Sequence, residues 1–177
     1  MTTFLNRVTG AALLRPAIYE EVEADRSATV QAMGVVALSS LAAGVGALGF
    51  TSARVTTLAG ISLLAFAVWG IWALLTLQIG ARIFPAPRTQ ADIGQLLRTI
   101  GFATAPGILR IAGVIPGTTT VVFGVTAVWM LMAMIVAIRQ ALDYTSTARA
   151  FGVCALGWAL SLGFAIGIGL LWSPPLQ

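Results

Sequence analysis

The sequence predicts an all-α fold: an integral membrane bundle of five transmembrane helices with short cytoplasmic helices at the interface. Hydrophobic residues make up 58% of the chain and charged residues only 9%, and the apolar residues fall into five long runs. Because soluble domains carry about 25% charged residues, this chain has too few charges to cover a water-exposed surface. The runs are continuous rather than alternating, which favours helices over strands, since a helix satisfies its own backbone groups in lipid.

Five segments have the length that a membrane-spanning helix requires, about 20 residues with a range of roughly 17–25. They comprise residues 29–50, 56–80, 99–115, 118–138 and 150–172. The third is the shortest, and Pro106 within it predicts a kink, because proline removes a backbone donor and clashes with the preceding turn. The chain therefore divides into a cytoplasmic segment, residues 1–28, and a transmembrane domain, residues 29–177.

Arginine placement predicts the orientation in the membrane. All ten cations are arginines, and eight lie before the first run, between the second and third, or between the fourth and fifth. These eight are Arg7, Arg15, Arg26, Arg82, Arg88, Arg98, Arg139 and Arg149. Cytoplasmic connections carry an excess of positive charge, so the N-terminus is expected in the cytoplasm. Five spans then place the C-terminus outside, and the expected location is the cell membrane, inner or plasma.

Small residues recur inside the runs. The chain has 19 glycines, and four-residue spacings of small residues occur at Ala42 and Gly46 in the first run and at Gly163 and Gly167 in the fifth. Such spacing lets helix backbones approach closely. The glycines as a set therefore predict a tightly packed bundle, without identifying which helices touch.

Two cytoplasmic segments have the pattern of amphipathic helices. Their apolar faces comprise Phe4, Val8, Ala11 and Ala12 near the N-terminus, and Ile93, Leu96, Leu97 and Ile100 before the third run. Helical spacing of this kind favours helices that lie in the headgroup layer. Membrane anchoring is the simpler interpretation of both segments, and docking of a partner is the alternative.

Four of the six acidic residues lie in one stretch, RPAIYEEVEADR, which spans residues 15–26 and ends directly before the first run. Pro16 suits the first turn of a helix, and glutamates near its positive end are favoured there. Ile18 and Val22 form its apolar side, with a tyrosine beside them at the interface. A solvated helix cap is one interpretation of the stretch. The other is a docking surface for a protein partner at the cytoplasmic face, which would comprise Tyr19, Glu20, Glu21 and Glu23.

The predicted spans contain no aspartate, glutamate, histidine or lysine, and the chain has a single cysteine. Intramembrane acids and histidines usually mark proton and ion pathways, and metal sites need clusters of His, Cys or carboxylate ligands. A protease needs a nucleophile with a base. The pattern therefore predicts no catalytic residue, no metal site, no cofactor and no enzymatic role. Arginines dispersed at span ends also argue against nucleic acid as a partner.

Arg110 is the one cation inside a predicted span. It lies five residues before the end of the third run, which is about 7–8 Å at an α-helical rise and within the reach of a snorkelling side chain. This depth favours snorkelling to the interface. The alternative is that Arg110 faces a polar cavity beside the kink at Pro106, where carbonyls, water or a lipid phosphate would balance its charge.

The order of these features resembles that of the Yip family in its bacterial branch, five-span membrane proteins of which the eukaryotic members interact with Ypt and Rab GTPases. Three stretches carry the resemblance: RPAIYEEVEADR before the first span, AIRQALDYTSTARA before the last, and LLRTIGFATAPGIL in the third, where Gly101, Phe102 and Pro106 match the family's Gly-aromatic and proline pattern. The resemblance implies a cytosolic N-terminus, five helices and a non-enzymatic role. Rab partners are not carried over, because the lysine-free composition is typical of a GC-rich bacterium.

Two functions stay open from the sequence. The first is a membrane scaffold or interaction protein that presents its acidic segment at the cytoplasmic face. The second is a small transporter, channel or lipid-handling protein that acts as a homo-oligomer and uses the kinked third span. Its candidate intramembrane residues are Gly101, Phe102, Pro106 and Arg110. The lipid bilayer is the partner that the composition itself requires.

Overall fold

The computed structural model describes the backbone of residues 2–49, 55–82 and 92–172, and the side chains in these ranges except those of residues 55–57, 77, 81, 82, 158 and 161–172. Throughout them the regular elements are helices, which confirms the predicted all-α class. In chain order they are α1 (Phe4–Ala12), α2 (Pro16–Ala24), α3 (Ala28–Ala47), α4 (Val55–Arg82), α5 (Ile93–Ala103), the 3-10 helix η1 (Ala105–Val114), α6 (Thr119–Ala141) and α7 (Thr147–Trp172). The connection between the second and third predicted spans lies outside the described residues.

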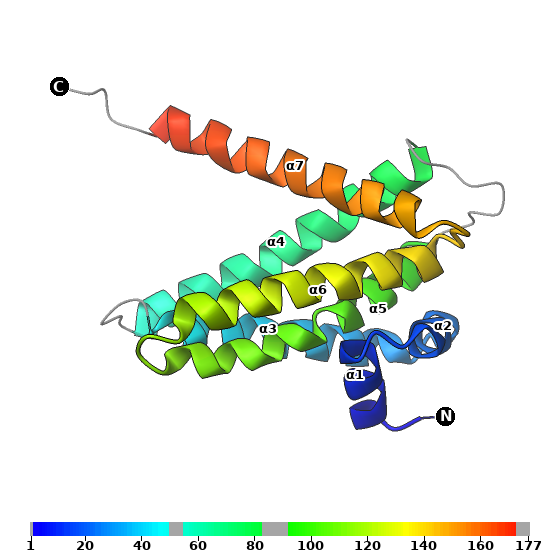
Figure 1. Cartoon of the computed structure of the whole chain (residues 1–177), viewed down its shortest axis with the longest axis horizontal. Coiled ribbons are helices and arrows are strands. Elements are labelled where there is room, and N and C mark those ends of the chain that lie inside the picture. Colours follow the sequence, from blue (N-terminus) through cyan, green and yellow to red (C-terminus); the bar gives the residue numbers. More distant parts are fainter. Residues whose placement is uncertain (1, 50–54, 83–91, 173–177) are drawn as a thin grey trace.

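Three of the helices are long and apolar enough to cross a membrane: α3, the part of α4 from Leu58 to Gly80, and α6. They coincide with the first, second and fourth predicted spans. The fifth predicted span coincides with α7, whose side chains beyond Leu160 lie outside the described residues, so the Gly163 and Gly167 spacing stays a prediction. Figure 1 shows α3, α4 and α6 along the long axis of the molecule, while α7 starts beside the end of α6 and diverges from it.

The third predicted span, residues 99–115, is divided between two helices of different type. α5 ends at Ala103 and η1 begins at Ala105, so the helix type changes directly before Pro106. Proline disfavours α geometry in the residue before it and cannot donate to the preceding turn, but it is tolerated in the first turn of a new helix. The predicted break at Pro106 is therefore confirmed. Because a 3-10 helix rises about 2.0 Å per residue rather than about 1.5 Å, the segment is longer than a continuous α-helix would be.

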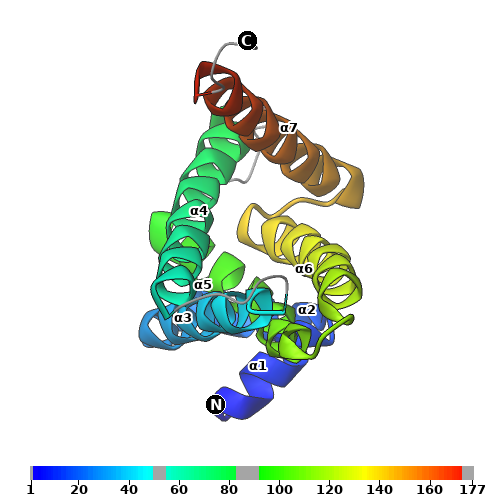
Figure 2. The ribbon, with the colours of Figure 1, turned by 90° about the vertical axis from the view of Figure 1, so that its left-hand side faces the viewer.

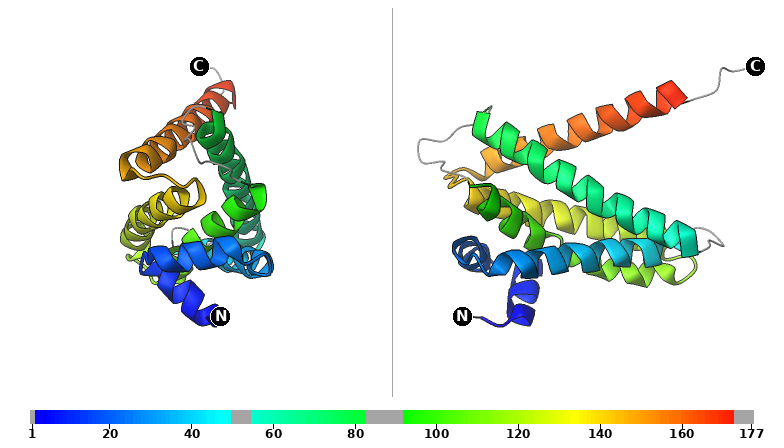
Figure 3. Two further views of the ribbon diagram at one scale, coloured as in Figure 1. Left: turned by 90° about the vertical axis from the view of Figure 1, so that its right-hand side faces the viewer. Right: turned by 180° about the vertical axis from the view of Figure 1, so that it is seen from behind.

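The helices α1 and α2 lie across one end of the bundle, next to α5 (Figures 1 and 3). The apolar face predicted for the N-terminal segment contacts the protein: Ala11 is buried in a core, and Phe4, Val8 and Ala12 are partly buried against it. Leu5 and Leu13 are the exposed apolar residues of this segment, at 71% and 59%. The helical period of the apolar residues was thus predicted correctly, and the apolar face of the helix contacts protein.

Two apolar cores hold the bundle together. One includes Trp72, Leu96, Ile138, Leu142 and Val153, where α4, α5, α6 and α7 meet. The other includes Tyr19, Val22, Val35, Phe102 and Ala133, where α2, α3, α5 and α6 meet. The second predicted interfacial face lies on α5 and contributes Leu96 and Ile100 to the first core, whereas Ile93 is half exposed. Figure 2 shows the long helices from their ends, with α3 beside α4 and α4 beside α7.

Candidate functional site

A buried arginine fastens the acidic segment to the bundle. The side chain of Arg7 is only 2% exposed, and its guanidinium donates to carboxylate oxygens of Glu21 and Asp25, each at 2.8 Å. Its remaining Nη donates to Gln31 Oε1 at 3.0 Å, at the start of α3. The bond from Arg7 lowers the pKa of Glu21, and bonds from Ser27 and Arg7 lower the pKa of Asp25 to about 2. Both carboxylates are therefore charged at neutral pH and already occupied within the chain.

Tyr19 lies in the interior rather than on the surface predicted for docking. Its side chain is fully buried, and its hydroxyl donates to the carbonyl of Ala11 at 2.9 Å. The indole N–H of Trp129 in α6 donates to the neighbouring carbonyl of Ala12 at 2.7 Å. These carbonyls lie in the last turn of α1, where the helix itself supplies no i+4 partner, and that of Ala11 also accepts from the backbone N–H of Leu14 at 3.0 Å. Tyr19 and Trp129 thus attach the end of α1 to α2 and α6 by hydrogen bonds.

A second arginine joins the third predicted span to the acidic segment. Arg98 in α5 is 5% exposed, and it donates from Nε to the carbonyl of Val22 at 3.0 Å and from Nη2 to that of Glu23 at 2.5 Å. Both carbonyls lie at the negative end of α2, where a cation is favoured. The sequence placed Arg98 only among the arginines that set orientation. Its partners lie 75 and 76 residues away along the chain, so no local pattern could identify them.

Three other acidic side chains surround an open pocket of about 440 Å³, which we name the polar pocket. It lies where α2 meets α5, the end of α6 and the connection to α7. Its wall includes Glu20, Glu23, Gln95, Arg139, Asp143 and Tyr144. Gln140 donates from Nε2 to Glu20 Oε1 at 2.6 Å, and Arg139 donates from Nε to the carbonyl of Tyr144 at 3.4 Å. Three carboxylates and one arginine leave the pocket with an excess of acid.

Burial and the excess of acid both act on the pKa of Glu23. Burial and the charges of Asp143 and Glu20 raise the pKa of Glu23 to about 7, although Arg98 acts in the opposite direction. Arg98 compensates only in part because its N–H groups are directed at carbonyls. Within the described ranges, no group of three or more His, Cys, Asp and Glu side chains could hold a metal ion. The chemistry that the polar pocket offers is attraction for a cationic group.

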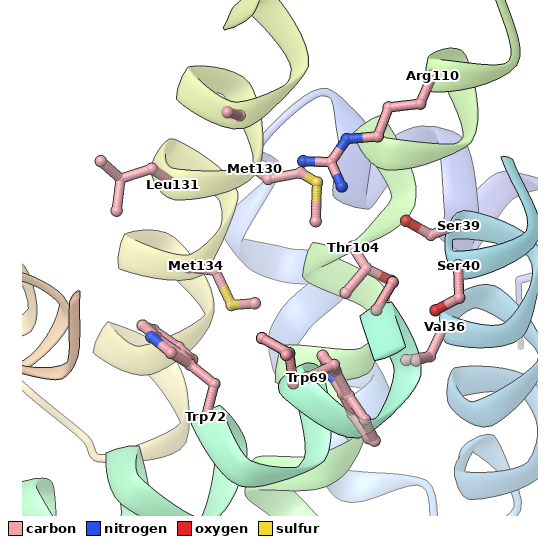
Figure 4. A pocket seen from close by; sticks show the side chains of 13 residues that line it. Val36, Ser39, Ser40, Trp69, Trp72, Thr104, Arg110, Met130, Leu131 and Met134 are labelled. Carbon is pink, nitrogen blue, oxygen red and sulfur yellow. The ribbon is translucent and has the colours of Figure 1, made fainter. Parts of the chain in front are cut away.

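A second cavity, which we name the Arg110 cavity, lies inside the bundle between α3, α4, α6 and η1. Its volume is about 220 Å³. Figure 4 shows its wall, which includes Ser39, Ser40, Trp69, Trp72, Thr104 and Met130. The polar members come from α3 and from the junction of α5 with η1, and the aromatic ones from α4.

Arg110 is part of the wall of this cavity. Its carbonyl packs against Gly46 near the end of α3, whereas its side chain turns inward over the cavity, on the side of Ser39 (Figure 4). The Nε donates to Thr126 Oγ1 at 3.3 Å, and the guanidinium carbon lies 5.3 Å from the centre of the Phe123 ring. That distance is within cation–π range. The sequence left open a cavity beside the kink, and the structure has such a cavity with Arg110 in its wall.

The other three intramembrane candidates lie at contacts between helices, outside the wall of the Arg110 cavity. A side chain at Gly101 would place its Cβ 2.8 Å from the Cβ of Ala32, so glycine allows α5 to approach α3 closely. Phe102 is fully buried in the core around Tyr19. Pro106 is buried where η1 begins. These residues therefore position η1, and through it Arg110.

The geometry leaves two candidate binding sites of opposite charge. The polar pocket has an excess of carboxylates and opens at the end of the bundle that carries α1 and α2. The Arg110 cavity has a cation and lies between the long helices. Comparisons with family models, with curated proteins and with solved structures found no match for this chain, so function has to be inferred from these two sites.

Proposed function

We propose that the chain is a non-enzymatic membrane protein of the Yip-like type, with five spans in the cell membrane and a cytoplasmic N-terminus, and that it acts as a scaffold. Its polar pocket receives a basic side chain of a protein partner at the cytoplasmic face. The observation that carries this proposal is the convergence of three carboxylates with one arginine on an open pocket of about 440 Å³. An acidic pocket attracts a cationic partner and rejects an anionic one.

The lengths of five segments support five spans. Three helices already have the length and apolarity of spans. The helix α7 covers 26 residues. Laid end to end, α5 and η1 extend ~16 Å as α-helix and ~20 Å as 3-10 helix, which together exceed a hydrocarbon core of about 30 Å.

The firm attachment of the acidic segment supports the scaffold function. Arg7, Arg98 and Trp129 hold α1 and α2 on the bundle, so Glu20 and Glu23 are presented by a fixed backbone. A preformed pocket loses less conformational entropy when a partner binds. A cation that enters would also stabilise the ionised form of Glu23, whose charge the pocket itself does not balance.

Removing pocket carboxylates should weaken the binding of a basic probe. In nanodiscs of zwitterionic lipid, the full chain is expected to bind labelled tetralysine more tightly than labelled tetraglutamate, and less tightly at high salt. The double variant Glu23→Gln and Asp143→Asn should bind tetralysine about tenfold more weakly, because two of the three charges are lost. Asparagine is suited to position 143, where φ is +50°. Fluorescence anisotropy measures both affinities.

The matched control is Asp92→Asn, which removes a carboxylate outside the polar pocket. Asp92 is the N-cap of α5, and asparagine caps a helix as well as aspartate does. Glu21 is unsuitable for this test, because its replacement would leave the buried Arg7 without one of its partners. A loss of binding could then result from a loss of folding. If the double variant binds tetralysine as tightly as the control does, the pocket is not a docking site for basic groups.

The affinity for tetralysine should rise between about pH 6 and about pH 8, because Glu23 ionises through about 7 and only its charged form attracts a cation. The unliganded protein should show the opposite trend. Between the ordinary pKa of 4.5 and about 7, the folded state holds the proton on Glu23 more strongly than the unfolded state, so stability falls as pH rises. The chain has no histidine that titrates in this range. Both trends should flatten in Glu23→Gln, and retention of either trend would assign it to another group.

The alternative function, a small oligomeric transporter, channel or lipid-handling protein, is favoured by one observation. Arg110 lines a cavity between the long helices. Among these activities lipid handling fits that cavity best, because its wall is mostly apolar and carries a single arginine.

A further inference from the structure

The wall of the Arg110 cavity holds buried polar groups that the described part of the chain leaves without partners. Ser39 and Ser40 are 5% and 6% exposed, and no hydrogen bond joins either hydroxyl to another described residue. The indole N–H of Trp69, a residue 8% exposed, likewise has no partner there. By contrast, the hydroxyls of Thr76 and Thr126 donate to carbonyls of their own helices. Figure 4 shows both serines on the side of α3 that faces the cavity.

The charge of Arg110 is not neutralised by the described residues. A guanidinium has five N–H donors, and the hydrogen bond to Thr126 uses the one on Nε. The ion pairs found within the described ranges both belong to Arg7. Contact with the ring of Phe123 offsets part of the cost of a cation inside an apolar bundle. The donors on Nη1 and Nη2 are left for a group that enters the cavity.

The polar groups without partners indicate which kind of ligand the cavity can bind. Guanidinium and indole nitrogens only donate hydrogen bonds, and a serine hydroxyl can donate. A ligand that satisfies all of them must therefore bring acceptor oxygens and negative charge. The rest of the wall is apolar, with Val36, Val68 and Leu131 among its members. Val68 is also 49% exposed, so this part of the cavity wall reaches the outer surface of α4.

We propose that the Arg110 cavity binds the oxyanion headgroup of a singly charged amphiphile, either a lipid phosphodiester or a fatty-acid carboxylate. One arginine matches one negative charge. A cavity of about 220 Å³ is smaller than the ~300–1,000 Å³ of sites that enclose a whole ligand, so the headgroup enters and the hydrocarbon lies along the apolar wall towards the lipid. The site does not rest on the scaffold function, because its wall shares no residue with the polar pocket.

The test is native mass spectrometry of the full chain released from a neutral detergent with each of four probes. Phosphatidylglycerol and oleate carry the two headgroups, phosphatidylcholine has no net charge, and inorganic phosphate has no chain. We expect phosphatidylglycerol or oleate to bind about tenfold more tightly than phosphatidylcholine, and the Arg110→Gln variant to lose that preference. The matched control Arg26→Gln removes an exposed arginine and should retain it. Preference for one of the two charged probes identifies the headgroup.

A second variant keeps the test decisive if Arg110→Gln does not fold. Trp69→Phe removes the indole donor and retains an aromatic ring, so it should weaken the preferred probe about threefold while the thermal midpoint stays close to that of the wild type. The proposal is overturned if phosphatidylcholine binds as tightly as both charged amphiphiles, or if inorganic phosphate alone binds. It is also overturned if folded Arg110→Gln keeps the wild-type preference. None of these outcomes depends on tetralysine binding, so the two proposals fail separately.

Discussion

Replacing Arg7 by methionine should lower the free energy of unfolding by about 3 kcal/mol, because removing one partner of a buried ionic network leaves the others unpaired. The side chain of Arg7 is 2% exposed and makes the connections among α1, α2 and α3. Methionine keeps much of the length and the apolar stem of arginine, so the change isolates the charge. For a chain of this size the loss corresponds to a fall in thermal midpoint of roughly 6–12 °C. Differential scanning fluorimetry in detergent measures it.

The control for this prediction is Arg15→Met. Arg15 is an exposed arginine at the start of α2, with no side-chain capping bond, and its replacement should change the stability by less than about 0.5 kcal/mol. The effect at Arg7 should also depend on pH with a definite sign. Folded-state pKa values of Glu21 and Asp25 are lowered, so the stability that they contribute is present above their ordinary pKa values and is lost as pH falls towards about 2. Equal midpoints for Arg7→Met and Arg15→Met would contradict the network.

The sequence predicted helices far better than the partners of polar side chains. Apolar runs are local, so their length and continuity place α3, α4 and α6 without knowledge of the rest. Arg7 and Arg98 could not be placed in this way, because their partners are distant along the chain. Arginines outside a span are expected from membrane topology alone. For this reason the structural roles of Arg7 and Arg98 were not predicted.

The apolar side of the acidic segment is wider than predicted and includes Tyr19. Ile18 and Val22 were predicted to form its apolar side, whereas Tyr19 and Val22 are the fully buried pair and Ile18 is only partly buried. Both pairs have helical spacing, at four and three residues. Tyr19 was predicted at the interface because its hydroxyl is polar. In the structure the hydroxyl donates a hydrogen bond to a carbonyl at the end of α1, inside the protein. The acidic residues were correctly predicted to form a cluster. The carboxylate of Glu21, however, is paired with Arg7.

The helix type around Arg110 was not predictable from the sequence. A depth of about 7–8 Å assumes an α-helical rise, whereas five residues of 3-10 helix cover about 10 Å. A 3-10 helix also turns about 120° per residue instead of about 100°. Over the four residues from Pro106 to Arg110 the difference amounts to ~80°, so the side chain lies on another face of the segment. Snorkelling was thus argued from a depth and a direction that η1 does not have.

Gly46→Ala should destabilise the protein by about 1–3 kcal/mol, as overpacking does in a close-packed interior. A Cβ at Gly46 would collide with the carbonyl of Arg110, and backbone cannot move aside as a flexible side chain can. The matched control is Gly34→Ala on the same helix, where a Cβ meets nothing within 4 Å and should stabilise the helix by roughly 0.5–1 kcal/mol. Thermal unfolding in detergent should therefore show shifts of opposite sign. Shifts of the same sign would mean that α3 and η1 are not in contact at Gly46. Because that contact fixes the backbone of Arg110, Gly46→Ala should also weaken the binding of the charged amphiphile.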